Sequence, residues 1–298
     1  MRRLSLAALP LLIVACSAGS AATMPPSPGA TPSPSSIPSP STGGFGAIEH
    51  QTGATDVLLR FEEGGGFIAP GFLATEAPIF TLYGDGTVVF RNPMLEPLPP
   101  VGSVTPNRSF RTARLNEDQI QQVLEDALSR GGLGAARLEY SDQMIADAPT
   151  AVFTVNAGGL AKRISVYALG IDSGSSADAP ARDAFKALAA RLEDFDQGGA
   201  FATDEYAPDR YRGILMDGQP GAPDAKPWPW DGIKPADFAA NPDPNAFQLP
   251  ERVLSVAEVE ALAITPYRGG FLGLTLVGPG DGKTYSFSLR PLLPDEAS

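Results

Sequence analysis

Residues 79–91 read Ile-Phe-Thr-Leu-Tyr-Gly-Asp-Gly-Thr-Val-Val-Phe-Arg, and this stretch decides the fold class. Side chains of the β-branched and aromatic types, which favour extended backbone, flank the central Gly84-Asp85-Gly86 on both sides. An Asp-Gly pair between two such runs is a strong signal for a tight turn that joins antiparallel strands. The sequence therefore predicts a β-hairpin here.

Working outward from this hairpin, the same pattern recurs twice. Hairpins are predicted over residues 151–168 and 271–289, each with glycines at its turn. Single strands are predicted over residues 57–61 and 211–216, and the Pro/Gly/Asp-rich residues 217–250 are predicted to form a long loop.

Three segments are predicted to be helical. The first begins at Asn116, a residue type that caps helix N-termini, and ends before two glycines at 131–132. The second covers residues 183–195 and has its apolar side chains on one face. The third begins at Ser255, which with Glu258 forms the pattern of a capping box.

These elements predict an α+β fold class, in which antiparallel hairpins pack with a few helices and no parallel β-α-β order occurs. The folded region is expected to cover residues 44–298, with subdomains at about 54–197 and 204–298. A capped helix followed by a hairpin occurs in both halves, although the two do not match residue by residue.

The first fifteen residues have the order of a secretory signal: Arg2 and Arg3, an apolar run over 4–14, then a small residue. The apolar run is too short to span a bilayer permanently. Residues 13–16, Ile-Val-Ala-Cys, resemble the lipobox of bacterial lipoproteins, and Cys16 is the only cysteine. This resemblance implies transfer of diacylglyceryl to the Cys16 sulfur and cleavage before it. The alternative is an ordinary cleavable leader with an incidental cysteine.

A linker follows the predicted anchor. Residues 17–43 are nearly all Ser, Thr, Pro, Ala and Gly, so they have no apolar face to bury and favour extended polyproline-like backbone. We expect residues 16–43 to act as a spacer, with the protein attached to a membrane through Cys16 and facing the extracytoplasmic side. Two acyl chains suffice for stable attachment.

The charge balance excludes one class of partner. The chain carries 34 acidic against 22 basic residues, a formal net charge of −12, and cleavage before Cys16 removes two arginines to give −14. Such a surface repels phosphate backbones, so nucleic acid is not an expected partner, and an anionic membrane would not hold the protein by charge.

Few residues suggest catalysis or cofactors. His50 is the only histidine, and it lies where the linker meets the folded region. A catalytic base must be held rigidly by the surrounding structure, so His50 is not expected to be catalytic. With Cys16 lipidated, no thiol remains and zinc lacks ligands. Gly64-Gly65-Gly66 leads into no helix with a nearby lysine, so it is interpreted as a bend and not as a phosphate loop. We predict no catalytic residue, metal or cofactor.

Oxygen-bearing side chains occur in two patterns that could bind a metal or act in pairs. Residues 241–245, Asn-Pro-Asp-Pro-Asn, resemble the start of a calcium loop but lack its later glycine and glutamate, which favours a surface turn. The acids Glu62 and Glu63 are adjacent, and adjacent strand residues point to opposite faces, so they are not expected to line one site. Asp142 and Asp147 are interpreted as solvated charge.

Trp228-Pro229-Trp230 is the least ordinary segment of the predicted loop. Two indoles held by a proline form an aromatic surface if they are exposed, and tryptophan is enriched at binding hot spots. The favoured alternative is that both rings dock on the sheet and fix the loop, since an exposed pair promotes aggregation. The candidate ligand or partner surface is Lys226, Trp228, Trp230 and Asp231.

Two family resemblances follow from short motifs. Residues 80–86, 227–230 and 290–295 are similar to an uncharacterised family of secreted bacterial lipoproteins of actinobacterial type, which implies the same anchoring and no particular activity. Residues 57–168 are similar to emfourin-type metalloprotease inhibitors, through Arg60-Phe61-Glu62 running into Gly65-Gly66-Phe67. This second resemblance implies protease binding.

Three functions are therefore expected, in this order. The first is a lipid-anchored, non-catalytic binding or envelope-associated protein. The second is an inhibitor-like module that takes a secreted protease as its protein partner. The third is a carboxylate-dependent hydrolase of envelope glycans.

Overall fold

The computed structural model describes residues 46–68, 70–141, 145–171, 177–240, 249–264, 268–280 and 282–296. They form a mixed α+β fold with mostly antiparallel sheets, which confirms the predicted class. Phe45–Ser298 is one compact unit, and it holds two sheets. Within the described part of the chain, no helix is long and apolar enough to cross a membrane.

The first sheet contains both predicted hairpins of the first half. Its strands are β1 (Val57–Gly64), β2 (Phe80–Tyr83), β3 (Thr87–Phe90), β5 (Arg111–Arg114), β6 (Glu139–Tyr140), β7 (Thr150–Ala157), β8 (Leu160–Tyr167) and β9 (Asp204–Glu205). Their order is β6-β8-β7-β1-β2-β3-β5-β9, and every pair is antiparallel except the two-residue pairing of β6 with β8. Sequence analysis did not predict the short strands β5, β6 and β9.

The turn that was expected to decide the fold depends on Gly86. Its φ is +87°, in the left-handed region that side chains disfavour. A Cβ at this position would also collide with the carbonyl oxygen of Leu115. Leu115 lies against the turn because its N–H donates to Gly86 O at 2.8 Å. This hydrogen bond joins the hairpin to the residues directly before the next helix.

The helix predicted from Asn116 is α2 (Glu117–Glu125). The Asn116 side chain accepts the Gln119 N–H at 2.9 Å, and the Gln119 side chain accepts the Asn116 N–H at 2.9 Å, which is the reciprocal capping box. One π-helical turn (Asp126–Arg130) continues it as far as Gly131.

The second predicted helix is α3 (Ala179–Glu193), which begins four residues earlier than expected and ends two residues earlier. Pro180 occupies its second position, where a missing N–H does not matter because the first turn leaves N–H groups without helical acceptors.

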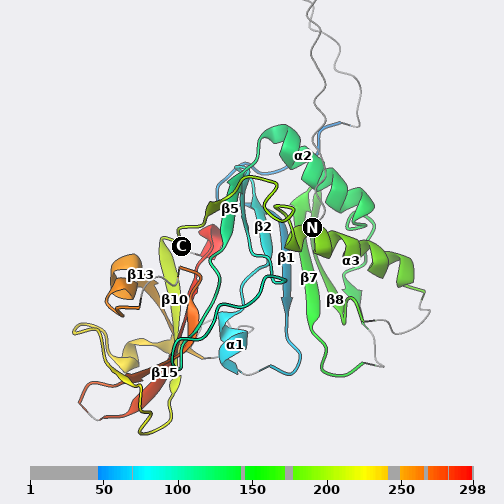
Figure 1. Ribbon diagram of the computed structural model, residues 1–298. Helices are drawn as coiled ribbons and strands as arrows, with labels where there is room; N and C mark the ends of the chain where they lie inside the picture. The colour runs from blue at the N-terminus through cyan, green and yellow to red at the C-terminus, as the bar shows by residue number, and fades with distance from the viewer. Residues whose placement is uncertain are drawn as a thin grey trace, which may run out of the picture. The chain divides into compact units, whose positions relative to one another are not determined.

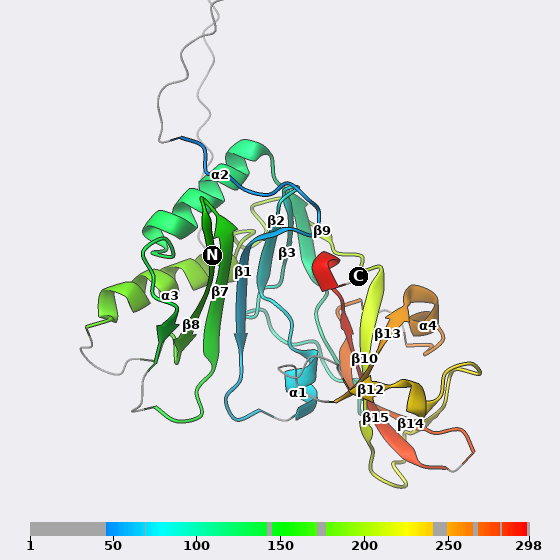
Figure 2. The ribbon, with the colours of Figure 1, turned by 180° about the vertical axis from the view of Figure 1, so that it is seen from behind.

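Helices α2 and α3 cover one face of the first sheet, as Figures 1 and 2 show. Phe153 is central to this core, with its ring 4.8 Å from Phe61 and 5.9 Å from Phe185 of α3. Ile120 and Leu124 bring α2 into the same cluster. The core therefore joins predicted strands to predicted helices.

The second sheet is formed mainly by the C-terminal half. Its strands are β4 (Thr105–Pro106), β10 (Arg210–Asp217), β11 (Lys226–Pro227), β12 (Ala239–Ala240), β13 (Pro250–Ser255), β14 (Phe271–Val277) and β15 (Thr284–Pro291). The order is β11-β14-β15-β10-β13-β12, with β4 paired to β14. The predicted hairpin is β14–β15, and the predicted strand is β10. The pairing of β11 with β14 is parallel over two residues.

The region expected as a loop holds more structure than predicted. Residues 217–250 contain a 3-10 turn (Pro235–Asp237) and the strands β11 and β12. Strand β13 comes next and ends at Ser255, the residue predicted to cap the following helix. That cap begins α4 (Val256–Glu260), with its capping box formed as expected. Helix α1 (Pro70–Thr75) was not predicted.

The C-terminal segment returns from β15 to the first sheet, and Figures 1 and 2 show it beside β3 and β5. Leu293 packs there in a small cluster with Tyr83, Val89 and Phe110. The first sheet thus has helices on one face and the C-terminal segment on the other.

Candidate functional site

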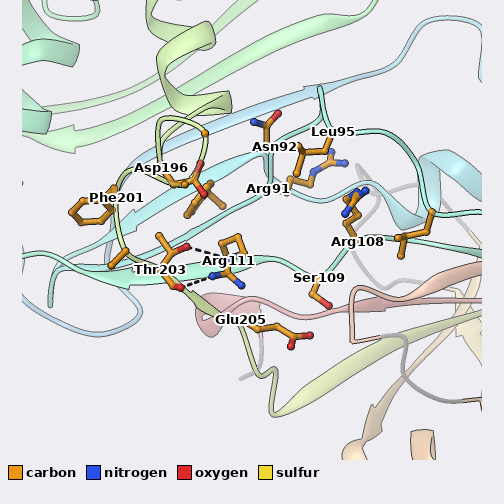
Figure 3. A pocket seen from close by; sticks show the side chains of 15 residues that line it. Arg91, Asn92, Leu95, Arg108, Ser109, Arg111, Asp196, Phe201, Thr203 and Glu205 are labelled. Carbon is orange, nitrogen blue, oxygen red and sulfur yellow. Dashed lines mark hydrogen bonds between the residues drawn. The ribbon is translucent and has the colours of Figure 1, made fainter. Parts of the chain in front are cut away.

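An arginine-lined pocket of about 700 Å³ lies beside the end of β3 and the start of β5. We call it the arginine pocket, because Arg91, Arg108 and Arg111 all line it (Figure 3). The segment that follows α3 forms the remaining wall and contributes Asp196 and Phe201.

Aromatic packing holds that wall in place. Phe195 directly follows α3, and its ring lies 5.0 Å from Phe80 and 5.4 Å from Phe90. Phe201 packs on Phe195 at 5.8 Å. The residues after α3 are thereby fixed against the first sheet although they belong to no helix or strand.

Arg111 ties the same wall to β5. Its Nε donates to the Thr203 hydroxyl at 3.0 Å, and its Nη2 donates to the Thr203 carbonyl oxygen (Figure 3). Arg111 is itself positioned by its pairing with Phe90 of β3. This arginine therefore has a structural role and also lines the pocket.

Arg91 is the most enclosed of the three. Its backbone N–H donates to Ile79 O at 2.8 Å, which extends the hairpin, and its Nη2 donates to Ala77 O at 3.0 Å. Its Nε is buried and has no hydrogen-bond partner among the described residues. Burial lowers the pKa of Arg91 from its usual value, the positive charge of Arg290 lowers it further, and Glu76 partly offsets both.

Arg108 is exposed and held by one hydrogen bond, from its Nε to Glu96 O at 2.7 Å. Within the described residues, neither Arg108 nor Arg91 nor Arg111 has a carboxylate oxygen within 4.0 Å. Two acids line the pocket, Asp196 and Glu205, and Glu205 faces Arg268 at 3.8 Å. The pocket thus has an excess of positive charge in a chain of net charge −12.

Such a pocket is suited to binding an anion. Guanidinium groups bind carboxylates and phosphates through paired hydrogen bonds. They are not acids or nucleophiles at neutral pH, because the guanidinium stays protonated. Apolar side chains of Phe90, Leu98 and Phe201 complete the lining, which favours a ligand that also has an apolar part.

The predicted tryptophan surface lies elsewhere, in the core of the second sheet. Trp230 is buried, and its indole donates to Glu258 O at 2.8 Å. Trp228 packs edge-on to Trp230 at 5.2 Å and donates to Ile233 O at 2.6 Å. This is the docked arrangement that we weighed as the alternative to an exposed surface, while Lys226 and Asp231 are exposed.

His50 is held more firmly than its place in the sequence suggested. Its side chain is 5 % exposed, and Nε2 lies 3.1 Å from Glu117 at the start of α2. Residue 50 also pairs with Ala157 at the end of β7. Burial lowers the pKa of His50, but the Gln51 carbonyl and Glu117 raise it more, so the net pKa lies above 6.5.

The carboxylates of β1 correct another expectation. Glu62 and Glu63 both line one cavity of about 260 Å³ together with Glu76, although adjacent strand residues point to opposite faces. The cavity lies where β1 ends, so its lining reaches both faces. Glu62 pairs with Arg163 at 2.9 Å, and burial raises the pKa of Glu76. The carboxylate-dependent hydrolase stays the third expected function, and none of these acids is assigned a catalytic role.

Several predicted positions lie outside the described residues: Cys16, Asp142 and the calcium-like turn 241–245. Asp147 is described and has φ +55°. Within the described ranges, no group of three or more histidine, cysteine or acidic side chains could hold a metal ion.

Sequence analysis missed the arginine pocket. Its signal is faint: Arg91 ends the predicted hairpin, and Arg108 and Arg111 stand three apart in a region assigned no element. The pocket forms only because the segment after α3, some ninety residues later, packs against them.

No family model matches this chain, and no curated protein or solved structure is significantly similar to it.

Proposed function

We propose that this protein is a non-catalytic, lipid-anchored extracytoplasmic binding protein whose ligand carries an anionic group. The observation that carries the proposal is the arginine pocket, where Arg91, Arg108 and Arg111 have no carboxylate partner within 4.0 Å among the described residues. A bound anion would accept charge-assisted hydrogen bonds from these guanidinium groups, and it would offset the burial of Arg91 and the repulsion between Arg91 and Arg290.

Binding is tested by titrating the full chain, carrying Cys16→Ser to avoid detergent, with butanoate and with inorganic phosphate in a calorimeter. Butylamine is the control of opposite charge. Arg108→Gln should weaken anion binding at least several-fold, because Arg108 is exposed and its loss breaks only one hydrogen bond.

The matched control is Arg137→Gln, which removes the same charge outside the pocket. The proposal is wrong if neither anion binds. It is also wrong if the Arg108→Gln variant binds the anions as tightly as the protein that keeps Arg108.

The anchor is supported by the leader, by the position of Cys16 and by the linker composition. In cells, Cys16→Ser should release the protein from the membrane fraction or leave an uncleaved precursor. A processed product that stays membrane-bound would contradict the anchor.

A second candidate, a protease-inhibitor-like module, is favoured by one observation. Phe67 follows Gly65-Gly66 in the segment that resembles emfourin-type inhibitors, and 94 % of its side chain is exposed. An exposed phenylalanine on a glycine-rich bend is suited to a partner's apolar subsite. Dose-dependent inhibition of a secreted metalloprotease that Phe67→Ser abolishes would support this function, and no inhibition across a protease panel would exclude it.

A further inference from the structure

A second cavity, of about 510 Å³, adjoins the arginine pocket. Five side chains line both: Arg91, Asn92, Leu95, Leu98 and Arg108. The two hollows therefore share one wall, and two of the three pocket arginines stand on it.

This second hollow, which we call the apolar cavity, is lined mainly by hydrocarbon. Phe72 of α1, Phe110 and Leu272 of β14 contribute, together with several prolines. Its polar lining includes three arginines but one carboxylate, Glu76. An apolar cavity with a few positively charged side chains at one wall is suited to an amphiphile.

The position of the 105–108 segment explains why the cavity exists. The chain leaves the first sheet after β3 and returns to it as β5, and between them β4 pairs with β14 of the second sheet, with Thr105 opposite Leu272. Asn107 N donates to Gly270 O at 2.9 Å. The chain thereby crosses between the sheets and leaves space on the side that faces α1.

The rim of the apolar cavity is unusually exposed for apolar side chains. Phe72 is 54 % exposed, Leu95 is 52 % exposed and Ile68 is 39 % exposed, and all three line the cavity. Soluble proteins rarely leave neighbouring large apolar groups in water without a binding role.

Two arginines of the cavity lining, Arg91 and Arg290, are largely enclosed by protein. Arg290 is 4 % exposed; both of its terminal nitrogens donate to Glu296, but its Nε has no hydrogen-bond partner among the described residues. The Nε of Arg91 is also buried and has no hydrogen-bond partner among the described residues. Both Nε atoms are covered by protein, so any contact between these arginines and a ligand must come from the terminal nitrogens.

We propose that the arginine pocket and the apolar cavity hold one ligand, a single-chain amphiphile whose anionic head group contacts Arg91 and Arg108 and whose acyl chain lies in the apolar cavity. This inference rests on the proposed function and names its ligand class. The head group is bound at the shared wall, and the chain covers Phe72 and Leu272 from water.

The test is a chain-length series of straight-chain carboxylates, from butanoate to decanoate, titrated into the full chain carrying Cys16→Ser below their aggregation limits. Burial of one methylene contributes about 0.8 kcal/mol, so each added methylene should tighten binding by up to about fourfold. Decyl phosphate tests the other head group, and decyltrimethylammonium is the control of opposite charge.

The discriminating variant is Ile68→Asn with Phe72→Ser, because both side chains line the apolar cavity, neither lines the arginine pocket, and both are exposed enough to preserve the fold. It should flatten the chain-length dependence while butanoate binds as before. Val253→Ser, a substitution at an exposed apolar position elsewhere, is the matched control.

The outcomes separate the two proposals. If butanoate binds in an Arg108-dependent way but longer chains bind no tighter, the amphiphile inference is wrong and the anion-binding function stands. If long chains bind equally to the Ile68/Phe72 variant, or if the cationic amphiphile binds as tightly, the inference is also wrong. If no carboxylate of any length, no inorganic phosphate and no decyl phosphate binds, both proposals fail.

Discussion

Arg60 in β1 and Asp295 near the C-terminus are joined across 235 residues of sequence: the Arg60 Nη2 donates to both carboxylate oxygens of Asp295, at 2.7 and 2.8 Å. The Tyr83 hydroxyl donates to the same carboxylate at 2.6 Å. Asp295 therefore attaches the end of the chain to two strands of the first sheet.

We expect Asp295→Ala to lower the free energy of unfolding by about 2–4 kcal/mol, because it leaves two largely buried donors, on Arg60 and Tyr83, without an acceptor. Urea denaturation measures this. The double variant Arg60→Met with Asp295→Ala should lose less unfolding free energy than the sum of the two single variants, because both substitutions remove the same Arg60–Asp295 interaction. Simple additivity would show that the pair contributes nothing specific.

Acid should also weaken the neighbouring contact between Arg290 and Glu296. Burial alone would raise the pKa of Glu296. Hydrogen bonds from Arg290 and from the Leu293 N–H, together with the positive charge of Arg290, lower this pKa below 4.5. Because the folded-state pKa is the lower one, this carboxylate stabilises the fold above pH 4.5, and the contribution is lost as the pH falls below that value.

The measurement for Glu296 is the free energy of unfolding at a series of pH values from about 6 down to about 3. Glu296→Gln should be less stable at the upper end and depend less steeply on pH. An unchanged slope in this variant would contradict the assignment.

His50 should titrate above its ordinary range. The net raised pKa means that His50 stabilises the fold fully below pH 6.5, and that this contribution disappears as the pH rises through the higher folded-state value. An NMR titration measures the pKa directly, and the chain has only one histidine, so the imidazole signals need no assignment. Glu117→Gln should lower this pKa, whereas Glu125→Gln, an exposed change on the same helix, should not.

The Gly86 turn should tolerate no side chain. We expect Gly86→Ala to destabilise by more than about 2 kcal/mol, because left-handed backbone strain adds to the collision with Leu115 O. Gly159→Ala is the matched comparison: its φ is +73°, but a Cβ there meets nothing within 4 Å, so about 1 kcal/mol is expected. Equal losses in thermal or urea denaturation would show that the collision relaxes.

The tryptophan segment should prove structural. Trp230→Ala removes a buried ring and its hydrogen bond to Glu258 O, and we expect a loss of about 3–5 kcal/mol of stability. Lys226→Ala and Asp231→Ala change exposed side chains and should alter stability by less than about 0.5 kcal/mol. A stable Trp230→Ala protein would contradict the packed arrangement.

The elements that could be predicted are those with a local signal. The hairpin at 79–91 and the Asn116 and Ser255 caps depend on neighbouring residues, so their patterns are visible in the chain. The strands β4, β9, β11 and β12 were missed because two-residue pairings have no periodicity to detect; they exist only where a distant strand supplies hydrogen-bond partners.

The candidate site shows the same division more sharply. Arg91 could be placed at the end of a strand, but nothing near it in the sequence indicates that Thr203 and Phe201 would line the same pocket. The tryptophans, by contrast, attracted attention because they are rare, although their indoles serve the core of the second sheet.

By itself, the sequence determined the α+β class, the hairpins and the helix caps, because each depends on side chains within a few residues of one another, whereas lipidation at Cys16 stays a prediction. Only the tertiary structure decided which face of each strand is buried, that Asp295 returns to Arg60, and that three arginines share a pocket and adjoin an apolar cavity. Those features depend on contacts between residues tens to hundreds of positions apart, whose free energy is gained only when the whole core has packed.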